Sequence, residues 1–340
     1  MTRHPTNGTG PGERVPLLAR APGFPALEPV HEDRFHADLT AWRRNIGAPV
    51  ALDIAPPAAV QPVGLDVVSW NVAVGAGDVD ELLRRVRAGA YSGFGLDPAR
   101  PLVLLLQEAY RTDSTIPELA VSRHHGGHRL IPGRHDVADF AQRAGLSLRY
   151  VPSMRNGNHR SDRGNAVLAS VALEDAHAFL LPYVRQRRVA VTTHLAGIPD
   201  IVLATAHLDT GGRPRGGPLL TRFAAGRLMQ AHELASRLVD PEHDACVVLG
   251  ADLNTPLGVR DPVVRALLGS GFHPSHRVGD WRHTYHGGVR LLLDHVLFRS
   301  PTERIVRVAV TRVDEVPGDR SGRVFGSDHH PLLARVDFRA

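Results

Sequence analysis

The stretch GSDHHPLLARV, residues Gly326–Val336, joins a β-strand to a cluster of chemically active side chains. Its second half is apolar and is typical of a strand. Its first half places the carboxylate of Asp328 beside the imidazole of His329, directly before that strand. Because Pro331 cannot donate a hydrogen bond to a neighbouring strand, we expect the polar residues to lie outside the sheet proper. An imidazole can accept a proton near neutral pH and a carboxylate can hold a cation, so this strand end offers both functions.

Several other apolar, strand-like runs end in polar side chains in the same way. The residues at these ends are Asn71, Glu108, His207, Asp209, Asp252 and Asn254. A further acid, Asp294, lies inside the apolar run Leu291–Phe298, where an unpaired carboxylate would be costly. An imidazole is its cheapest partner, because the carboxylate would orient the ring and stabilise its protonated form. Each residue alone also fits a turn, a helix cap or a satisfied core histidine, and only the joint pattern indicates a site at His329.

The composition allows a large core and gives modest support to a phosphate-bearing substrate. The chain has 340 residues, of which 43% are hydrophobic, and a formal net charge of +5. All 40 basic residues are arginines, which we attribute to a coding bias together with the abundant Ala, Gly and Pro. Arginine side chains nevertheless suit phosphate oxygens through their paired donors.

The sequence favours a soluble protein in a reducing compartment. Cys246 is the one cysteine, so no intramolecular disulfide can form, and its apolar neighbours indicate a core position. The N-terminal stretch lacks the apolar block of a signal peptide, and no apolar run reaches the length of a membrane span. We expect a cytoplasmic monomer without a transmembrane segment.

The pattern divides the chain at about residue 62. Residues 1–62 are rich in Pro and Gly, and we predict a partly disordered extension with one helix over 31–46. From residue 63 to 340 strands predominate and helices separate some of them, which indicates packed sheets with helices outside. The predicted strands are 65–72, 101–106, 148–151, 166–171, 189–194, 201–206, 245–249, 291–298, 304–313 and 332–338, and the predicted helices are 78–90, 136–146, 219–239 and 261–268.

The polar strand ends, taken in order, resemble the motifs of the endonuclease/exonuclease/phosphatase superfamily, which has the deoxyribonuclease-I-like fold. The matching segments are Ser69-Trp70-Asn71, Leu106-Gln107-Glu108, Arg163-Gly164-Asn165-Ala166, Thr205-Ala206-His207-Leu208, Gly250-Ala251-Asp252-Leu253-Asn254, Leu293-Asp294-His295 and Ser327-Asp328-His329. The resemblance runs from about Leu65 to the C-terminus. It implies an α/β (α+β) fold, a four-layer αββα sandwich of two packed, mainly antiparallel sheets with helices outside. It also implies cleavage of phosphate esters with Mg²⁺ or Mn²⁺.

The resemblance also implies roles for single residues. Glu108 would be the principal metal ligand, with Asn71 close to the metal and the phosphate, and Asp328 would complete the surroundings of the metal and His329. His329 would be the general base, or the imidazole that stabilises the attacked phosphate, and Asp294 would hold it.

Further roles carried by the resemblance concern the water and the phosphate. Asp252 and Asn254 would orient the attacking water and the phosphate, and His207 would bind the phosphate or serve the leaving group. Asn165 and Arg163 match a family segment whose roles vary, and Arg155 lies in the donor-rich loop before it. The chain departs from the family at Ala251, where Gly is usual, and at Ala73, where the abasic-endonuclease branch has an acid; the second departure argues against that branch.

The sequence leaves the substrate open. The first hypothesis is a metal-dependent phosphodiesterase acting on nucleic acid. The alternatives are a phospholipid or phosphoinositide hydrolase of the sphingomyelinase type and a non-catalytic phosphate-binding protein. The number of metals and endo or exo cleavage also stay open. The histidines near Gly126–Gly127 and the diffuse group His273, His276, His283 and His286 are not predicted to bind metal, and His330 is predicted to be a loop residue beside the base.

Overall fold

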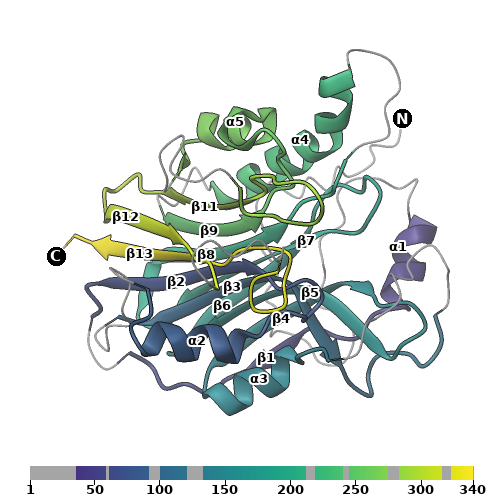
Figure 1. Cartoon of the computed structure of the whole chain (residues 1–340), viewed down its shortest axis with the longest axis horizontal. Coiled ribbons are helices and arrows are strands. Elements are labelled where there is room, and N and C mark those ends of the chain that lie inside the picture. Colours follow the sequence, from purple (N-terminus) through teal and green to yellow (C-terminus); the bar gives the residue numbers. More distant parts are fainter. Residues whose placement is uncertain are drawn as a thin grey trace, which may run out of the picture.

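Two β-sheets packed face to face form the centre of the molecule (Figure 1). The structure is a computed structural model that describes residues 36–58, 61–91, 100–120, 133–211, 219–239, 245–274, 283–315 and 323–339. The Pro- and Gly-rich stretch 1–35 therefore lies outside the described residues, as do His124, His125, His128 and His276. In the part of the chain that is described, no helix has the length and apolar character needed to cross a bilayer.

The first sheet has seven strands and the second has six. In spatial order the first contains β1 (Val50–Leu52), β4 (Ser147–Arg155), β5 (Ser161–Ala169), β3 (Leu102–Thr112), β2 (Gly64–Asn71), β13 (Leu332–Phe338) and β12 (Ile305–Arg312). The second contains β10 (His273–Pro274), β11 (Asp294–Arg299), β9 (Cys246–Asp252), β8 (Ile198–His207), β7 (Val189–Leu195) and β6 (Leu173–Leu180). Neighbouring strands are antiparallel except for two parallel pairs, β2 with β3 and β8 with β9.

Helices cover the outer face of each sheet. On the first sheet, α2 (Val79–Arg87) and α3 (Val137–Ala144) bury their apolar sides in one cluster with the strands, and on the second, α5 (Pro262–Gly269) and the later part of α4 (Leu219–Leu238) do the same. The remaining elements are α1 (His36–Arg43) and the 3₁₀ turn Gly258–Arg260. A third cluster, between the sheets, holds residues such as Leu65, Val167, Leu203 and Val296. The predicted four-layer sandwich is confirmed.

The two sheets approach most closely beside the strand ends. The buried side chain of Gln107 on β3 crosses the interface and donates from Nε2 to Thr205 Oγ1 at 3.0 Å and to the carbonyl oxygen of Gly250 at 3.2 Å. A Cβ atom at Gly250 would lie 2.6 Å from Ser69 Oγ of the opposite sheet, which is too close for any side chain. These contacts hold the ends of β2 and β3 against the ends of β8 and β9.

The differences from the sequence predictions concern strands with weak apolar patterns. The strand β6 was not predicted, because its polar residues Glu174, Asp175 and His177 interrupt the apolar pattern. The short strands β1 and β10 were not predicted either. Within the segment predicted as an extension, α1 occupies 36–43, and the fully buried Trp42 donates from its indole nitrogen to the carbonyl oxygen of Ser153.

A buried ion pair fixes the segment after α1 to the first sheet. Arg111 on β3 pairs with Asp162 on β5 at 2.6 Å, and both side chains are almost inaccessible to solvent. Asp162 also accepts hydrogen bonds from Tyr150 Oη and from the backbone N–H of Gly47, while Arg111 donates to the carbonyl oxygen of Ala48. The pair therefore links α1 and β1 to the centre of the sheet.

We predict that Asp162→Ala lowers the free energy of unfolding by about 3–5 kcal/mol, because it removes the buried partner of Arg111 and leaves that charge only the partly exposed Asp113, at 3.3 Å. The matched control is Asp80→Ala, which removes an ion pair to Arg143 whose side chains are both about half exposed, so its cost should be about 0–1 kcal/mol. Urea denaturation of the three proteins measures both values. Equal effects of the two substitutions would contradict the structural role given to the buried pair.

Candidate active site

The predicted site residues meet at one edge of the sandwich because of strand direction and register. In the first sheet, Asn71 at the end of β2 pairs with Gln107, next to Glu108. In the second sheet, His207 at the end of β8 pairs with Asp252 at the end of β9. The strand β11 runs in the opposite direction, so its first residue, Asp294, pairs with Asp252. Asp294 is thus not in the middle of a strand, as the sequence indicated, but at the start of one.

His329 and Asp294 form a tight hydrogen-bonded pair. His329 Nδ1 lies 2.8 Å from Asp294 Oδ2, and both side chains are almost fully buried. Burial disfavours the charged imidazolium, but the carboxylates of Asp294, Asp252 and Asp328 outweigh it and raise the pKa of His329 to about 10. The ring therefore carries a proton at neutral pH, and its Nε2 faces the rest of the site, 4.0 Å from Asp252 Oδ2.

Asp252 connects the two sheets within the site. Its Oδ2 accepts a hydrogen bond from Asn71 Nδ2 at 2.8 Å and lies 3.2 Å from His207 Nε2. Its Oδ1 accepts the backbone N–H of Asn254 at 3.0 Å. Burial and the nearby Asp294 carboxylate raise the pKa of Asp252 to about 7, although His329 and Asn71 oppose the rise. The carboxylate is therefore positioned and tuned to accept a proton near neutral pH.

His207 is held in its neutral form. Burial lowers its pKa well below the ordinary value, and the positive charges of Arg188, His329 and Arg163 add to the effect. Its Nε2 lies 3.1 Å from Asn254 Nδ2, which also donates to the carbonyl oxygen of Leu208 at 2.9 Å. A neutral imidazole can donate a proton from one ring nitrogen and accept one at the other, but it offers no positive charge that would attract a phosphate.

Glu108 projects into the site from a distorted part of β3. The pairing of β3 with β5 is irregular between Leu106 and Ala109, and Glu108 has a left-handed backbone with φ of +53°. Non-glycine residues adopt this conformation at a cost that is often accepted at functional sites. Its partly exposed carboxylate lies 3.9 Å from His207 Nδ1. The predicted meeting of Glu108 with the acids and imidazoles of the second sheet is therefore present in the structure.

The donors at this edge suit a hard divalent cation. Glu108, Asp328 and Asn71 line the same cleft and offer carboxylate and amide oxygens, the ligands that Mg²⁺ and Mn²⁺ prefer. The carboxylates of Asp252, Asp294 and Asp328 act on the single imidazole of His329, so the acids outnumber the imidazolium at this point of the cleft. The buried Asp294 Oδ1 has no hydrogen-bond partner among the described residues. Asp252, Asp294 and His329 also lie close enough to share an ion, but the hydrogen bond between Asp294 and His329 explains their approach without one.

Glu108, Asp252 and Asp328, named here the acidic floor, line a cleft of about 1090 Å³ that arginines also line. The arginines that line it are Arg134, Arg163, Arg188, Arg227, Arg260, Arg265 and Arg323. Arg188 is 2% exposed, and its Nε has no hydrogen-bond partner among the described residues. Of these seven, Arg163 is the one that the sequence singled out as a candidate site residue.

Two candidate phosphate ligands lie elsewhere. Arg155 is fully buried and donates to the carbonyl oxygens of Gly157, Pro117 and Glu118, so it fixes loops and does not line the cleft. Asn165 is also buried, and it donates to the carbonyl oxygen of Val189 in the opposite sheet at 2.7 Å. The structure therefore does not bring these two side chains to the cleft, although the sequence grouped them with the phosphate ligands.

The sequence also gave no indication of Tyr285. The ring of Tyr285 lies with its centroid 4.8 Å from that of His329 and lines the cleft. It comes from the loop before β11, which has no periodic pattern. A single tyrosine in such a loop gives no signal in the sequence.

A sandwich of two sheets that gathers carboxylates, an Asp–His pair and arginines at one edge is typical of enzymes that act on phosphate esters. The sequence model of the Endonuclease/Exonuclease/phosphatase family matches residues 68–329, and the chain belongs to this family. The nucleases and phosphatases of this family are divalent-metal-dependent hydrolases of phosphate esters. The family suggested by the ordered strand ends is thereby confirmed.

Solved structures with the same fold share little sequence with this chain. An endonuclease/exonuclease/phosphatase family protein from Leptotrichia buccalis C-1013-b is 12% identical, with a TM-score of 0.50 over 81% of this chain and 100% of that chain. A functionally unknown conserved protein from Enterococcus faecalis V583 is 15% identical, with a TM-score of 0.50 over 81% and 100%. A truncated TDP2 from Caenorhabditis elegans is 18% identical, with a TM-score of 0.46 over 80% and 97%. Among curated proteins, no match to the chain is found.

We predict that Asp294→Asn lowers the pKa of His329 by about 1–3 pH units in the metal-free protein, because the closest opposing charge is lost. Histidine ¹⁵N NMR titration measures this value. Asp200→Asn is the control, because Asp200 lies near the start of β8, at the opposite end from His207, and is half exposed.

The substitution Asp294→Asn should also change how the free energy of unfolding depends on pH. In the folded wild type the pKa of His329 is raised from 6.5 to about 10, so the stabilisation by its proton is complete below pH 6.5 and is lost as the pH rises through 10. An unchanged His329 pKa in Asp294→Asn would show that the pair does not set the charge of the ring.

Proposed function

We propose that the chain is a phosphodiesterase that uses Mg²⁺ or Mn²⁺ and acts on nucleic acid. The observation that carries the proposal is the combination of an acidic floor, which suits a divalent cation, with seven arginines on the walls of the same cleft. Arginine side chains bind phosphate oxygens in pairs of hydrogen bonds. A linear polyanion that crosses the cleft would place one phosphate at the floor and its neighbours against the arginines.

The acid–base properties of the site support a division of roles between His329 and Asp252. A protonated His329 supplies a positive N–H to the attacked phosphate and is unsuited to act as a base at neutral pH. Asp252, with its raised pKa, is the better-matched acceptor for the proton of the attacking water, and Asn254 orients it. Glu108, Asn71 and Asp328 would hold the cation, which when bound neutralises charge on the phosphate.

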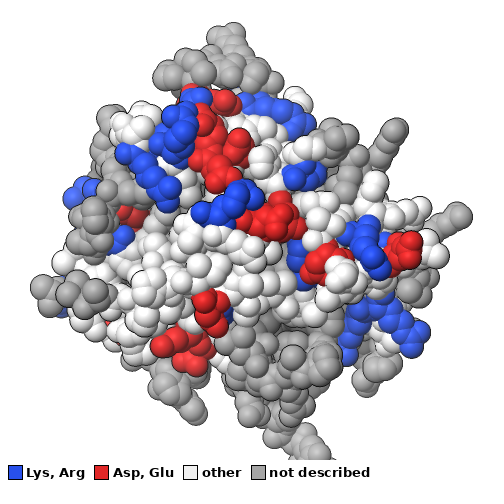
Figure 2. All heavy atoms as spheres, turned by 90° about the horizontal axis from the view of Figure 1, so that it is seen from below, with Lys and Arg blue, Asp and Glu red and all other residues white. Residues whose placement is uncertain are grey.

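The charge of the surface supports binding within the cleft. Figure 2 views the molecule from the side on which α2 and α3 lie in Figure 1, and there acidic and basic side chains are interspersed. On that side Arg84 pairs with Glu81 and Arg143 pairs with Asp80, so the charges largely cancel. The arginines of the cleft, by contrast, outnumber the acids that line it.

We predict that the purified protein with Mg²⁺ or Mn²⁺ hydrolyses plasmid DNA, single-stranded DNA or bis-p-nitrophenyl phosphate. Glu108→Gln and His329→Ala should each lower kcat/KM by about 10²–10⁴, the range typical for groups that act directly in the reaction. His232→Ala, an exposed residue on α4, should leave the activity unchanged. Absence of turnover on all three substrates would reject the proposal, and full activity of both site variants would show that the site is misassigned.

We predict that Arg188→Ala raises the KM for DNA about 10–100-fold, the value of one charge-assisted hydrogen bond, with a smaller effect on kcat. The slope of log KM against log salt should fall by about one, as expected when one phosphate contact is lost. Arg188→Lys should restore part of the affinity. Arg84→Ala is the control, because Arg84 is an exposed residue of α2 that does not line the cleft. A slope that does not change would place Arg188 outside the substrate path.

A phospholipid hydrolase is the second candidate, because two apolar side chains stand exposed at the cleft. Leu257 is 51% exposed and Val289 is 59% exposed, and both line the cleft. Turnover of sphingomyelin or inositol phosphates together with binding to liposomes, and no activity on DNA, would favour this candidate. Metal binding without turnover of any phosphate ester would favour the non-catalytic alternative.

A further inference from the structure

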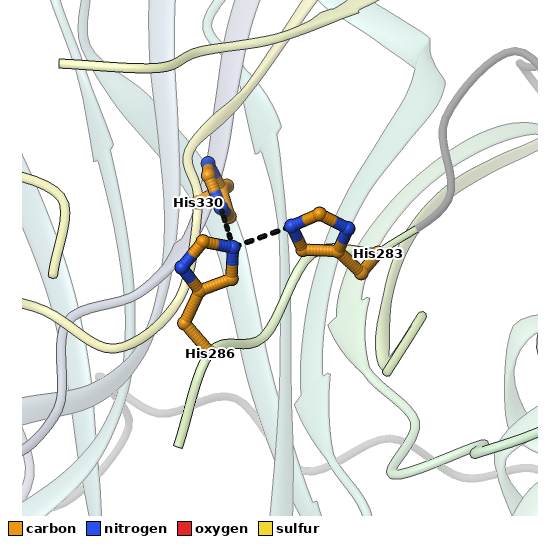
Figure 3. A group of neighbouring side chains, drawn as sticks. All are labelled: His283, His286 and His330. Atoms are coloured by element: carbon orange, nitrogen blue, oxygen red, sulfur yellow. Dashed lines mark hydrogen bonds between the residues drawn. The ribbon is translucent and has the colours of Figure 1, made fainter. Parts of the chain in front are cut away.

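Three histidines that the active site does not use converge next to it. His283 and His286 belong to the loop before β11, and His330 directly precedes β13. Figure 3 shows the three rings turned toward one another, with the imidazole of His286 between the other two. The sequence did not predict this group, because 44 residues separate His286 from His330.

The ring nitrogens of the three histidines lie close together, and the spacing of His286 Nε2 and His330 Nε2 suits two ligands of one metal ion. His286 Nε2 lies 3.1 Å from His330 Nε2 and in close contact with His283 Nε2, and ligand atoms of the three rings all lie within 4.8 Å. Three nitrogens bound to one tetrahedral zinc ion at 2.0–2.1 Å are about 3.3 Å apart. Without an ion, a ring nitrogen can make one in-plane hydrogen bond, so Nε2 of His286 cannot satisfy both neighbours.

The surroundings of His330 resemble those of metal-bound histidines. Its Nδ1 lies 2.9 Å from Asp314 Oδ1 and 2.9 Å from the carbonyl oxygen of Val313, both of which accept hydrogen bonds. A proton on Nδ1 leaves the lone pair of Nε2 free for the other two rings. Metal-ligating histidines commonly donate their second N–H to a carboxylate or a carbonyl oxygen in this way.

Two arginines lie near the group of histidines and act on His283. Arg312 is partly compensated by Asp314, with which it pairs at 3.0 Å, and the same arginine donates to the carbonyl oxygen of His283 at 2.8 Å. Arg290 is the second cation that acts on His283. Because these positive charges would repel a metal ion, its binding here would depend on the three ring nitrogens.

We propose that His283, His286 and His330 bind one zinc ion through their Nε2 atoms, with water as a fourth ligand. His330 is buried while His283 and His286 are partly exposed, which leaves an open side for the water. Three imidazoles suit Zn²⁺ better than Mg²⁺ or Mn²⁺, which prefer oxygen ligands, so this site is chemically distinct from the one at Glu108.

An ion at this position would fix the segments that hold His329. Thr284 Oγ1 accepts the backbone N–H of Asp294 at 3.0 Å, and the ring of Tyr285 packs on His329. The backbone N–H of His286 donates to the carbonyl oxygen of Asp328 at 2.8 Å. Zinc would therefore join the loop that orients Asp294 to the loop that carries His329, and its role would be structural.

The test is zinc binding by the full chain in excess Mg²⁺ after chelator treatment, measured by competition with a zinc indicator. We expect wild type, Glu108→Gln and His232→Ala to bind one zinc ion per chain, and His286→Ala and His283→Gln to lose it. Asp314→Asn should bind about 10–100-fold more weakly. X-ray absorption of the zinc-loaded Glu108→Gln variant should give a nitrogen or oxygen shell at about 2.0–2.1 Å with imidazole scattering.

Thermal unfolding measurements show whether each variant is folded. Zinc should raise the Tm of wild type and Glu108→Gln, and it should leave the Tm of a folded His286→Ala or His283→Gln unchanged. The proposal would be overturned if wild type bound no zinc in excess Mg²⁺, or if wild type and both histidine variants bound zinc equally. Either result would favour a metal-free stack of imidazoles. Because no substrate is used, the result does not depend on the phosphodiesterase activity.

Discussion

The close contact between the two sheets at Gln107 and Gly250 is the constraint on which the site depends. Two parallel strand pairs, one in each sheet, end at the same edge only because the sheets are held face to face at this point. Glycine at 250 permits the approach, since any side chain would meet Ser69. The amide of Gln107 then satisfies polar groups of both sheets, where an unpaired amide would be costly.

The charge of the site follows from this geometry. Strand ends of both sheets bring four carboxylates together, and their mutual repulsion is reduced by the protonated His329, by the Asn71 amide and by the raised pKa of Asp252. A divalent cation at Glu108 would remove the remaining imbalance. The arginines of the cleft lie around this acidic floor, so that a phosphate diester can be attracted to a site that would otherwise repel it.

Much of this arrangement could be predicted from the sequence, because strand ends obey simple rules. Asn71, Glu108, His207 and Asp252 were identified from polar residues that follow apolar runs, and register alone then brings them together. The direction of the side chains was less predictable. Arg155 and Arg163 come from one donor-rich segment, yet Arg155 donates hydrogen bonds to carbonyl oxygens of loops whereas Arg163 lines the cleft. His283 and His286 were noted in the sequence as part of a diffuse group without a predicted metal site, and His330 as a loop residue, because the three meet only through the tertiary packing of two loops.

The central claim is that Glu108, Asn71 and Asp328 hold a divalent cation at the edge of the sandwich where the strand ends of both sheets meet. The most direct measurement is an anomalous difference map from crystals of the protein soaked in Mn²⁺. The account predicts a manganese peak in the cleft, bound to the Glu108 carboxylate with Asn71 and Asp328 beside it and His329 facing the open side. A manganese-loaded crystal with no peak at Glu108 would contradict it.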